Sequence, residues 1–324
     1  MPYFDLSIPV DSCDILRGDE LARVRELIAT ASRLGYTCVA LDYRARLPLR
    51  PSDACRLQCA ALSGGGAGVP AFVDAVSTRM AAAAPRKLMS KRDAARLNAP
   101  PMVRKRKWGG EGGASAAPQS LSTYSGPLVI SRITIVIEST ADGGRFAAAR
   151  AATALSSPLL GGWDVIAVEP SDAAGLEAVA TAAGGVDIIS LDMSAARLPF
   201  SLSASLAATV VEGGGALFEL RYAPAIRDAG ARRFLVSTAR ALLVATRGRG
   251  VFLASGAKMA LELRAPRDAA AIADILGLPL QAALTALSTA SATVFAHAKR
   301  RRNGGVEVMP VVVAKEKDRS VDKH

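Results

Sequence analysis

Short runs of β-branched and aliphatic residues alternate with longer stretches of helical periodicity along most of this chain. The alternation is typical of repeated strand–helix units, which build parallel sheets. Most runs are apolar throughout, as expected for strands covered by helices on one face and by barrel side chains on the other. We therefore predict an α/β fold, a TIM-like (β/α) barrel of about seven parallel strands, closed irregularly because no eighth strand is evident. The predicted strands are Tyr3–Ile8, Cys38–Asp42, Arg132–Glu138, Asp164–Val168, Asp187–Leu191, Ala216–Leu220 and Val251–Ala254.

Several of the intervening stretches carry clear helix signals. Between Leu21 and Leu34, apolar residues recur at a period of 3.6, and Gly35 is the expected stop. Further helices are predicted near Arg232–Arg247, from Pro266 to Gly277, and from Pro279 to about Lys299. The triplet Gly213–Gly215, which precedes a strand, is predicted to be a helix-ending turn.

Two segments break this pattern. Residues 45–126 are rich in Ala, Gly, Pro, Ser and Arg and include the basic run Arg104–Lys107. A structureless connection of this length is rare in a compact fold, so we predict a mostly disordered insertion after the second strand, with one short helix over Ala71–Met80. Residues 301–324 mix charges and are predicted to be a disordered tail, which leaves the barrel to residues 1–300.

The charge balance favours a polyanionic partner. The chain has 324 residues, and its 40 Lys and Arg outnumber 29 Asp and Glu, for a formal net charge of +11. Such an excess suits nucleic acid, because Lys and Arg neutralise phosphates without reading bases. Membrane insertion and secretion are not expected, because no uncharged apolar run of about 18 residues and no signal-peptide pattern occurs. The basic runs Arg104–Lys107 and Lys299–Arg302 fit nuclear or nucleolar targeting.

Residues that could support hydrolysis by metal ions are few. The only histidines are His297, at a basic helix end, and His324, and we expect them to cap or to be solvated. Carboxylates within or just after strands could form an all-oxygen Mg²⁺ site, or could bind backbone amides, cap helices and pair with Arg132 and Arg264. These carboxylates are Asp5, Asp42, Glu138, Glu169, Asp192 and Glu219. We favour the second interpretation and assign no catalytic residue, metal ion or cofactor; the alternative is a metal-dependent phosphoesterase.

The segment Ser255–Lys258 follows the last predicted strand. Barrels often hold phosphate on backbone N–H groups at this place, so one hypothesis is that the segment grips an RNA phosphate. An ordinary strand–helix turn is the other interpretation.

A series of short segments, taken in order, resembles one family. They are Phe4–Leu6, Leu34–Tyr36, Val39–Ala40, Arg132–Ile135, Trp163–Val168, Leu198–Phe200, Phe218–Leu220, Tyr222–Asp228, Arg232–Arg233, Ser255 and Leu261–Arg264. Their order and spacing are similar to the TIM-barrel protein subunit of nuclear ribonuclease P and ribonuclease MRP, which belongs to the polymerase-and-histidinol-phosphatase-like barrels. The resemblance covers roughly residues 3–44 and 128–300.

The resemblance implies a non-catalytic, RNA-binding role in a ribonucleoprotein that matures precursor tRNA or processes ribosomal RNA. It implies that the particle's RNA performs the chemistry, and that the partners are this RNA, precursor tRNA and other protein subunits, including a small one. A scaffold without RNA contact is a third possibility. Candidate RNA-binding residues are Arg132, Arg232, Arg233, Lys258 and Arg264, and candidate partner or core contacts are Tyr222, Pro224 and Ile226.

Overall fold

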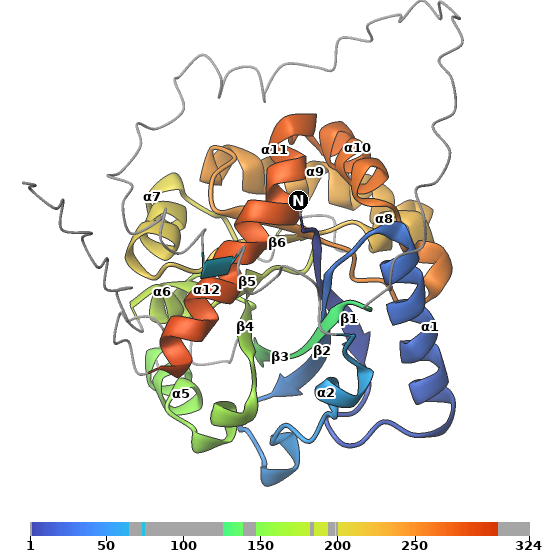
Figure 1. Cartoon of the computed structure of the whole chain (residues 1–324). Helices are drawn as coiled ribbons and strands as arrows, with labels where there is room; N and C mark the ends of the chain where they lie inside the picture. Colours follow the sequence, from blue (N-terminus) through green and yellow to red (C-terminus); the bar gives the residue numbers. More distant parts are fainter. Residues whose placement is uncertain are drawn as a thin grey trace, which may run out of the picture.

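The computed structural model describes residues 2–64, 73–74, 126–138, 147–181, 185–193, 198 and 200–303 (Figure 1). Within them, seven parallel strands follow one another in chain order around the sheet, each hydrogen-bonded to the next. They are β1 (Phe4–Val10), β2 (Cys38–Arg46), β3 (Leu128–Ile137), β4 (Val165–Pro170), β5 (Ile188–Ser190), β6 (Leu217–Arg221) and β7 (Val251–Ala254). The predicted barrel is confirmed, and each predicted strand overlaps an observed one.

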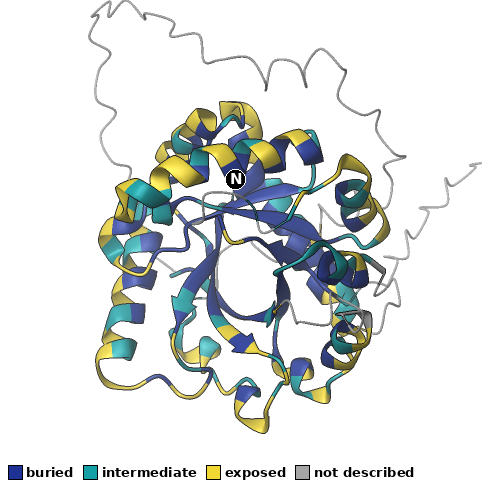
Figure 2. Ribbon diagram, turned by 180° about the vertical axis from the view of Figure 1, so that it is seen from behind, coloured by how far each residue is buried: buried dark blue, intermediate teal, exposed yellow. Residues whose placement is uncertain are grey.

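The first and last strands meet through the residues that follow β7. The Gly256 amide donates to the Ser7 carbonyl at 3.0 Å, and the Ser255 amide donates to the Asp5 carboxylate at 2.8 Å. The pairing of β1 with β2 shifts register between Asp5 and Ile8. The described strands therefore form a nearly closed ring inside a layer of helices (Figures 1 and 2), and hydrogen bonds from Ser255 and Gly256, in place of a strand ladder, bridge β7 to β1.

Several helices begin or end at residues that cap them. The Asp228 carboxylate accepts from the Ala231 amide at 2.6 Å and so caps the start of α9. Gly35 and Gly277 end their helices in the left-handed region, with φ of 97° and 107°, as the predicted stops require. The helices are α1 (Gly18–Leu34), α2 (Cys59–Leu62), α5 (Ala147–Leu155), α6 (Ala173–Thr181), α7 (Ala204–Ala208), α8 (Ala223–Arg227), α9 (Ala229–Thr246), α10 (Pro266–Leu276), α11 (Leu280–Thr285) and α12 (Ser291–Arg302).

Short helical turns join several of these elements. They are the 3₁₀ turns η1 (Pro51–Asp53), η2 (Pro158–Gly162) and η4 (Ala260–Glu262), and the π-helical turns η3 (Thr209–Gly213) and η5 (Ala286–Ala290). The turn η3 ends at Gly213 with Gly214 as its cap, as predicted for this glycine triplet. None of the described helices combines the length and the apolar character that a transmembrane span requires.

The predicted start of the insertion, at residue 45, is wrong. Strand β2 runs to Arg46, and η1 and α2 follow it. Asp53 anchors this stretch, because its carboxylate accepts from the Tyr43 hydroxyl at 3.0 Å and its carbonyl accepts from the Trp163 indole at 3.1 Å. Such tertiary bonds are invisible in a Pro- and Ala-rich composition. Of the predicted helix Ala71–Met80 only Val73 and Asp74 are described, and Arg104–Lys107 and residues 304–324 lie outside the described part.

Alternate residues of each strand point into the barrel, and they form two different layers. At the amino ends of the strands the interior is apolar and includes side chains from α12, which lies across this end of the barrel (Figure 1). The buried residues of this apolar layer include Phe4, Leu6, Cys38, Ala40, Ile130, Val165, Ala167, Ile188, Leu217, Phe252, Ala292 and Val294. At the carboxyl ends the inward positions carry charged and hydroxyl groups instead.

Helix α12 is held by charges at the amino end. His297 Nδ1 lies 2.7 Å from Asp187 Oδ1, and Arg301 donates to the same carboxylate at 2.9 Å. Asp187 is fully buried and His297 is 8% exposed, so the expectation that His297 is solvated or merely a helix cap is wrong. The predicted tail starts too early for the same reason, because Arg301 and Arg302 belong to α12 and make ion pairs. His324 lies outside the described residues.

Candidate functional site

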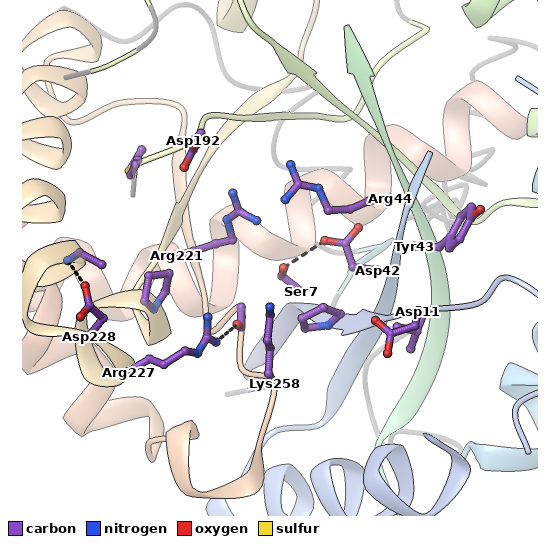
Figure 3. Close-up of a pocket in the computed structure, with 16 residues that line it drawn as sticks. Ser7, Asp11, Asp42, Tyr43, Arg44, Asp192, Arg221, Arg227, Asp228 and Lys258 are labelled. Atoms are coloured by element: carbon purple, nitrogen blue, oxygen red, sulfur yellow. Dashed lines mark hydrogen bonds between the residues drawn. The ribbon is translucent and has the colours of Figure 1, made fainter. Parts of the chain in front are cut away.

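A cavity of about 500 Å³ opens at the carboxyl ends of the strands. Four cationic side chains line it, from four different segments: Arg44 of β2, Arg221 of β6, Arg227 of α8 and Lys258 after β7. Figure 3 shows these side chains pointing toward the middle of the cavity. The carboxylates in its lining are Asp11, Asp42, Asp192 and Asp228. Pockets of about 300–1,000 Å³ with a few convergent polar groups are the usual size of small-ligand sites.

Arg132 occupies the centre of the barrel beneath this cavity and is fully buried. Its two terminal nitrogens donate to the two oxygens of Glu219 at 2.6 and 2.8 Å, and its Nε lies 3.2 Å from Asp42 Oδ1. The same guanidinium donates to the Leu6 carbonyl at 2.7 Å. The strand pattern explains this geometry, because Asp42 and Arg132 are register partners and both point inward.

The two buried carboxylates respond differently to Arg132. Burial works against ionisation of Glu219, but the charge and the paired hydrogen bonds of Arg132 lower its pKa to about 2. Burial raises the pKa of Asp42 above its ordinary value, and the single, longer contact with Arg132 does not cancel the effect. The bidentate geometry therefore identifies Arg132–Glu219 as the stable charged pair, and Asp42 as the group that takes up a proton more readily.

A second layer of charge lies just above. Arg44 hydrogen-bonds Glu169, and Arg221 lies 3.7 Å from Glu169 and 3.8 Å from Glu219. Burial raises the pKa of Glu169, although both guanidinium groups oppose the shift. Glu169 is thus the main negative charge that neutralises both Arg44 and Arg221, since Glu219 is already bound to Arg132.

Glu262, which is almost fully buried, holds the part of the cavity rim that Arg227 and Lys258 form. Both of its oxygens accept from Arg227 at 2.8 Å, and Oε2 also accepts from the Lys258 amide at 2.7 Å. Burial alone would raise the pKa of Glu262, but the hydrogen bonds from Arg227 and Lys258 lower it. The loop after β7 is therefore held rigidly while the Lys258 side chain stays exposed.

The loop after β7 does not offer free backbone N–H groups to a phosphate. The Ser255 amide donates to Asp5, the Gly256 amide to Ser7 and the Lys258 amide to Glu262. The Ala257 amide donates to the Ser255 hydroxyl at 3.1 Å. The hypothesis of a backbone phosphate grip is therefore wrong, because these amides already donate to groups of the protein. Gly256 and Lys258 of this loop line the cavity, and Lys258 brings a cationic side chain to it.

Two other sequence-based assignments need correction. Arg132 has no exposed surface, so it presents nothing to an RNA. Tyr222 is also fully buried, and its hydroxyl accepts from the Arg264 amide at 3.1 Å, so it is a core residue and not a partner contact. Pro224 lines the cavity, while Ile226 is partly buried against the core.

The remaining RNA-binding candidates lie at the surface but are not gathered into one site. Arg232 and Arg233 are exposed at the start of α9, and Arg232 donates to the Ala225 carbonyl at 2.7 Å. Arg264 is half-buried, and its guanidinium donates to the carbonyls of Leu261 and Leu263. Of the five candidates, only Lys258 lines the cavity.

Sequence reasoning missed the three cavity arginines. A signal was available for two of them, because Arg44 and Arg221 stand two residues after the inward-pointing Asp42 and Glu219. Alternation along a strand places residues two apart on one face. Arg227 lies in a short helix, where no such pattern applies.

The strand-end carboxylates that could have held Mg²⁺ are committed to protein groups. Asp42 and Glu219 bind Arg132, and Asp5 accepts from both the amide and the hydroxyl of Ser255. Across the described ranges, no group of three or more His, Cys, Asp or Glu side chains has an arrangement suited to a metal ion. The donors present favour the interpretation that these carboxylates bind amides and arginine.

The sequence of this chain matches a known protein family. A family model described as "RNase P subunit p30" matches residues 98–303, which is more than half of the chain. This chain belongs to the RNase P subunit p30 family. The match includes β3 to β7 and α12, and so covers Arg132, Glu219 and most of the cavity lining.

Two named ribonuclease P proteins are similar to this chain over shorter stretches. The mouse "Ribonuclease P protein subunit p30" is 36% identical over 117 residues, which are 36% of this chain and 43% of the mouse protein. The fission yeast "Probable ribonuclease P protein subunit 3" is 33% identical over 117 residues, 36% of this chain and 49% of that protein. The matches thus span less than half of these relatives. A chain in a "cryo-EM structure of archaeal Ribonuclease P with mature tRNA" aligns over 94% of this chain and 99% of its own length, at 15% identity and a TM-score of 0.47.

Proposed function

We propose that this protein is a non-catalytic, RNA-binding subunit of a ribonuclease P or ribonuclease MRP particle. In this role it supports 5′ maturation of precursor tRNA, processing of ribosomal RNA, or both, and it acts in the nucleus and nucleolus. Its partners are the RNA component of the particle, precursor tRNA and other protein subunits, a small one among them. Family membership over residues 98–303 is the observation that carries the proposal.

The charges of the barrel support an accessory role. The buried arginine at the centre neutralises the carboxylates that a metal-dependent hydrolase would need for its ions. Exposed cations remain on the surface, among them Arg232, Arg233 and Lys258. Exposed arginines and lysines bind RNA phosphates by releasing counterions, and this requires no catalytic group.

Affinity purification of the full chain from nuclei, followed by sequencing of the bound RNA, tests the proposal. We expect one abundant structured RNA together with precursor tRNAs or ribosomal RNA precursors, and co-purifying protein subunits. Charge reversal at Arg232 and Arg233 should weaken RNA recovery and leave the protein partners in place. Unchanged RNA recovery would instead favour a scaffold that does not touch RNA.

An assay of the purified protein with phosphate esters and Mg²⁺ or Mn²⁺ tests the phosphoesterase alternative. We expect no turnover above that of a Glu219→Ala control. Turnover that is lost on Asp5→Ala or Glu219→Ala would overturn the accessory role.

A further inference from the structure

We propose that the cavity at the carboxyl ends of the strands is a binding site for a phosphate group, held by Arg44, Arg221 and Lys258. The site is independent of the surface arginines considered above for RNA. It does not depend on the proposed place of the protein in a ribonucleoprotein.

The first argument is convergence. Arg44, Arg221 and Lys258 come from β2, β6 and the loop after β7, so the fold itself brings them to one cavity. In Figure 3 the guanidinium groups of Arg44 and Arg221 point toward one another, and the Lys258 ammonium points into the same space. Glu169 contacts both guanidinium groups but offers them one negative charge, so a bound anion would relieve the remaining repulsion between the cations.

The second argument is unused hydrogen-bonding capacity. Within the described residues, Arg221 makes one hydrogen bond, of 3.4 Å, from Nη2 to the Leu191 carbonyl, and its contacts with Glu169 and Glu219, at 3.7 and 3.8 Å, are too long for hydrogen bonds, although a guanidinium has five N–H donors. The Lys258 ammonium makes no hydrogen bond or ion pair with any described residue, although its own backbone is fixed by Glu262. An arginine fork beside an ammonium is a favourable arrangement for phosphate oxygens.

The third argument concerns the carboxylates of the lining, which could have cancelled the charge. Asp42 accepts from Ser7 and Thr134 and contacts Arg132, and Asp228 caps α9. Figure 3 shows Asp11 and Asp192 at opposite edges of the cavity, away from the Lys258 ammonium. With Glu169 shared by Arg44 and Arg221, the three cations still outnumber the carboxylates that contact them in the centre of the cavity.

The expected ligand is a phosphate monoester or diester of at most about nucleotide size, since the cavity of about 500 Å³ lies within the usual range for small-ligand sites. Such a phosphate could belong to a free mononucleotide or to the backbone of a nucleic acid. The chemistry that recognises it is the same.

Isothermal titration of the full chain at fixed ionic strength tests the site. The probes are inorganic phosphate, uridine 5′-monophosphate and the dinucleotide UpU, which has one bridging phosphate; uridine is the control without phosphate. We expect saturable one-site binding of at least one phosphate probe and none of uridine. Preference for the monophosphate would indicate a terminal phosphate, and preference for UpU would indicate a backbone phosphate.

Variants decide whether the cavity is the site. Lys258→Ala should weaken binding about tenfold or more, since a hydrogen bond to a charged group contributes about 1.5–3 kcal/mol. Arg221→Ala should remove detectable binding, and Arg240→Ala, on α9 outside the cavity, should leave the affinity unchanged. Circular dichroism checks that each variant is folded.

Absence of saturable binding of every phosphate probe, or equal affinities for wild type and Lys258→Ala, would overturn the inference. Neither result would bear on RNA association through Arg232 and Arg233, which lie outside the cavity.

Discussion

The two ends of the barrel are built on the same strands but differ in how they are closed. At the amino end, apolar side chains fill the interior and α12 lies across it, held by the Asp187 cluster. At the carboxyl end, charged side chains pair with one another and leave a cavity. One end is thus closed by packing and a helix, and the other by charge neutralisation. The second leaves a cavity of about 500 Å³ lined by four cationic side chains.

The largest effect expected from this comparison comes from the charged layer. Glu219→Gln leaves the buried Arg132 with the weaker Asp42 ion pair as its remaining charge partner, so the free energy of unfolding should fall by about 3–5 kcal/mol. Urea unfolding of purified protein measures the loss. Glu138→Gln is the matched control, because Glu138 is 59% exposed and pairs with the exposed Arg46; its cost should stay below about 1 kcal/mol. Equal costs for the two variants would remove the distinction between a stabilising buried layer and ordinary surface charge.

The second effect is a pH dependence located at the seam between β1 and the residues after β7. Burial raises the pKa of Asp5 from 3.8 to about 6 despite its hydrogen bonds with Ser255. Between these values the unfolded chain releases the proton before the folded chain does, so the unfolding free energy falls as pH rises through this window. The loss due to this group is about 3 kcal/mol at most.

Asp5→Asn tests this titration. The variant should reduce the difference in unfolding free energy between pH 4 and pH 7, measured by denaturant unfolding at both pH values. Asp14→Asn, an exposed control, should leave that difference as it is in wild type. A wild-type difference that Asp5→Asn does not change would show that other groups are responsible.

A smaller effect is expected at the amino end. Asp187→Asn removes the charge that holds His297 and Arg301 but keeps one oxygen for the Ile166 amide. The expected cost is about 2 kcal/mol, because hydrogen bonds to a buried charged group are weakened and not all are lost. Thermal or urea unfolding measures it, with Asp74→Asn as control at the exposed Lys299 pair. A cost above that of Glu219→Gln would reverse the ranking of the two ends.

Much of this fold could be predicted from the sequence, because strand and helix periodicity are local. The seven strands and the stops at Gly35 and Gly277 follow from patterns that span a few residues. The errors at residues 45 and 301 have one cause. Asp53 and Arg301 are ordered by partners far along the chain, Trp163 and Asp187, which composition does not reveal.

The site was only partly predictable for a related reason. That strand-end carboxylates bind amides and arginine was anticipated, and Asp5, Asp42 and Glu219 do so. An arginine on a strand is buried or lines the cavity according to whether its position points into the barrel and how far along the strand it lies. The composition of the strand does not show this. Arg132 was a candidate for RNA binding because it is a cation in a segment that resembles the family; its inward phase, two residues before Thr134, places it in the centre instead.

The amide of Gly64 donates to the carbonyl of Pro127 at 2.9 Å, next to the start of β3. The described chain therefore departs at Gly64 and returns at Gly126 through neighbouring points on the amino-terminal side of the ring. Asn303, after α12, leaves from that same side. A segment inserted directly after Gly64 or fused after residue 303 is thus attached at the end of the barrel opposite the cavity. Neither of these attachment points lies at the entrance of the cavity.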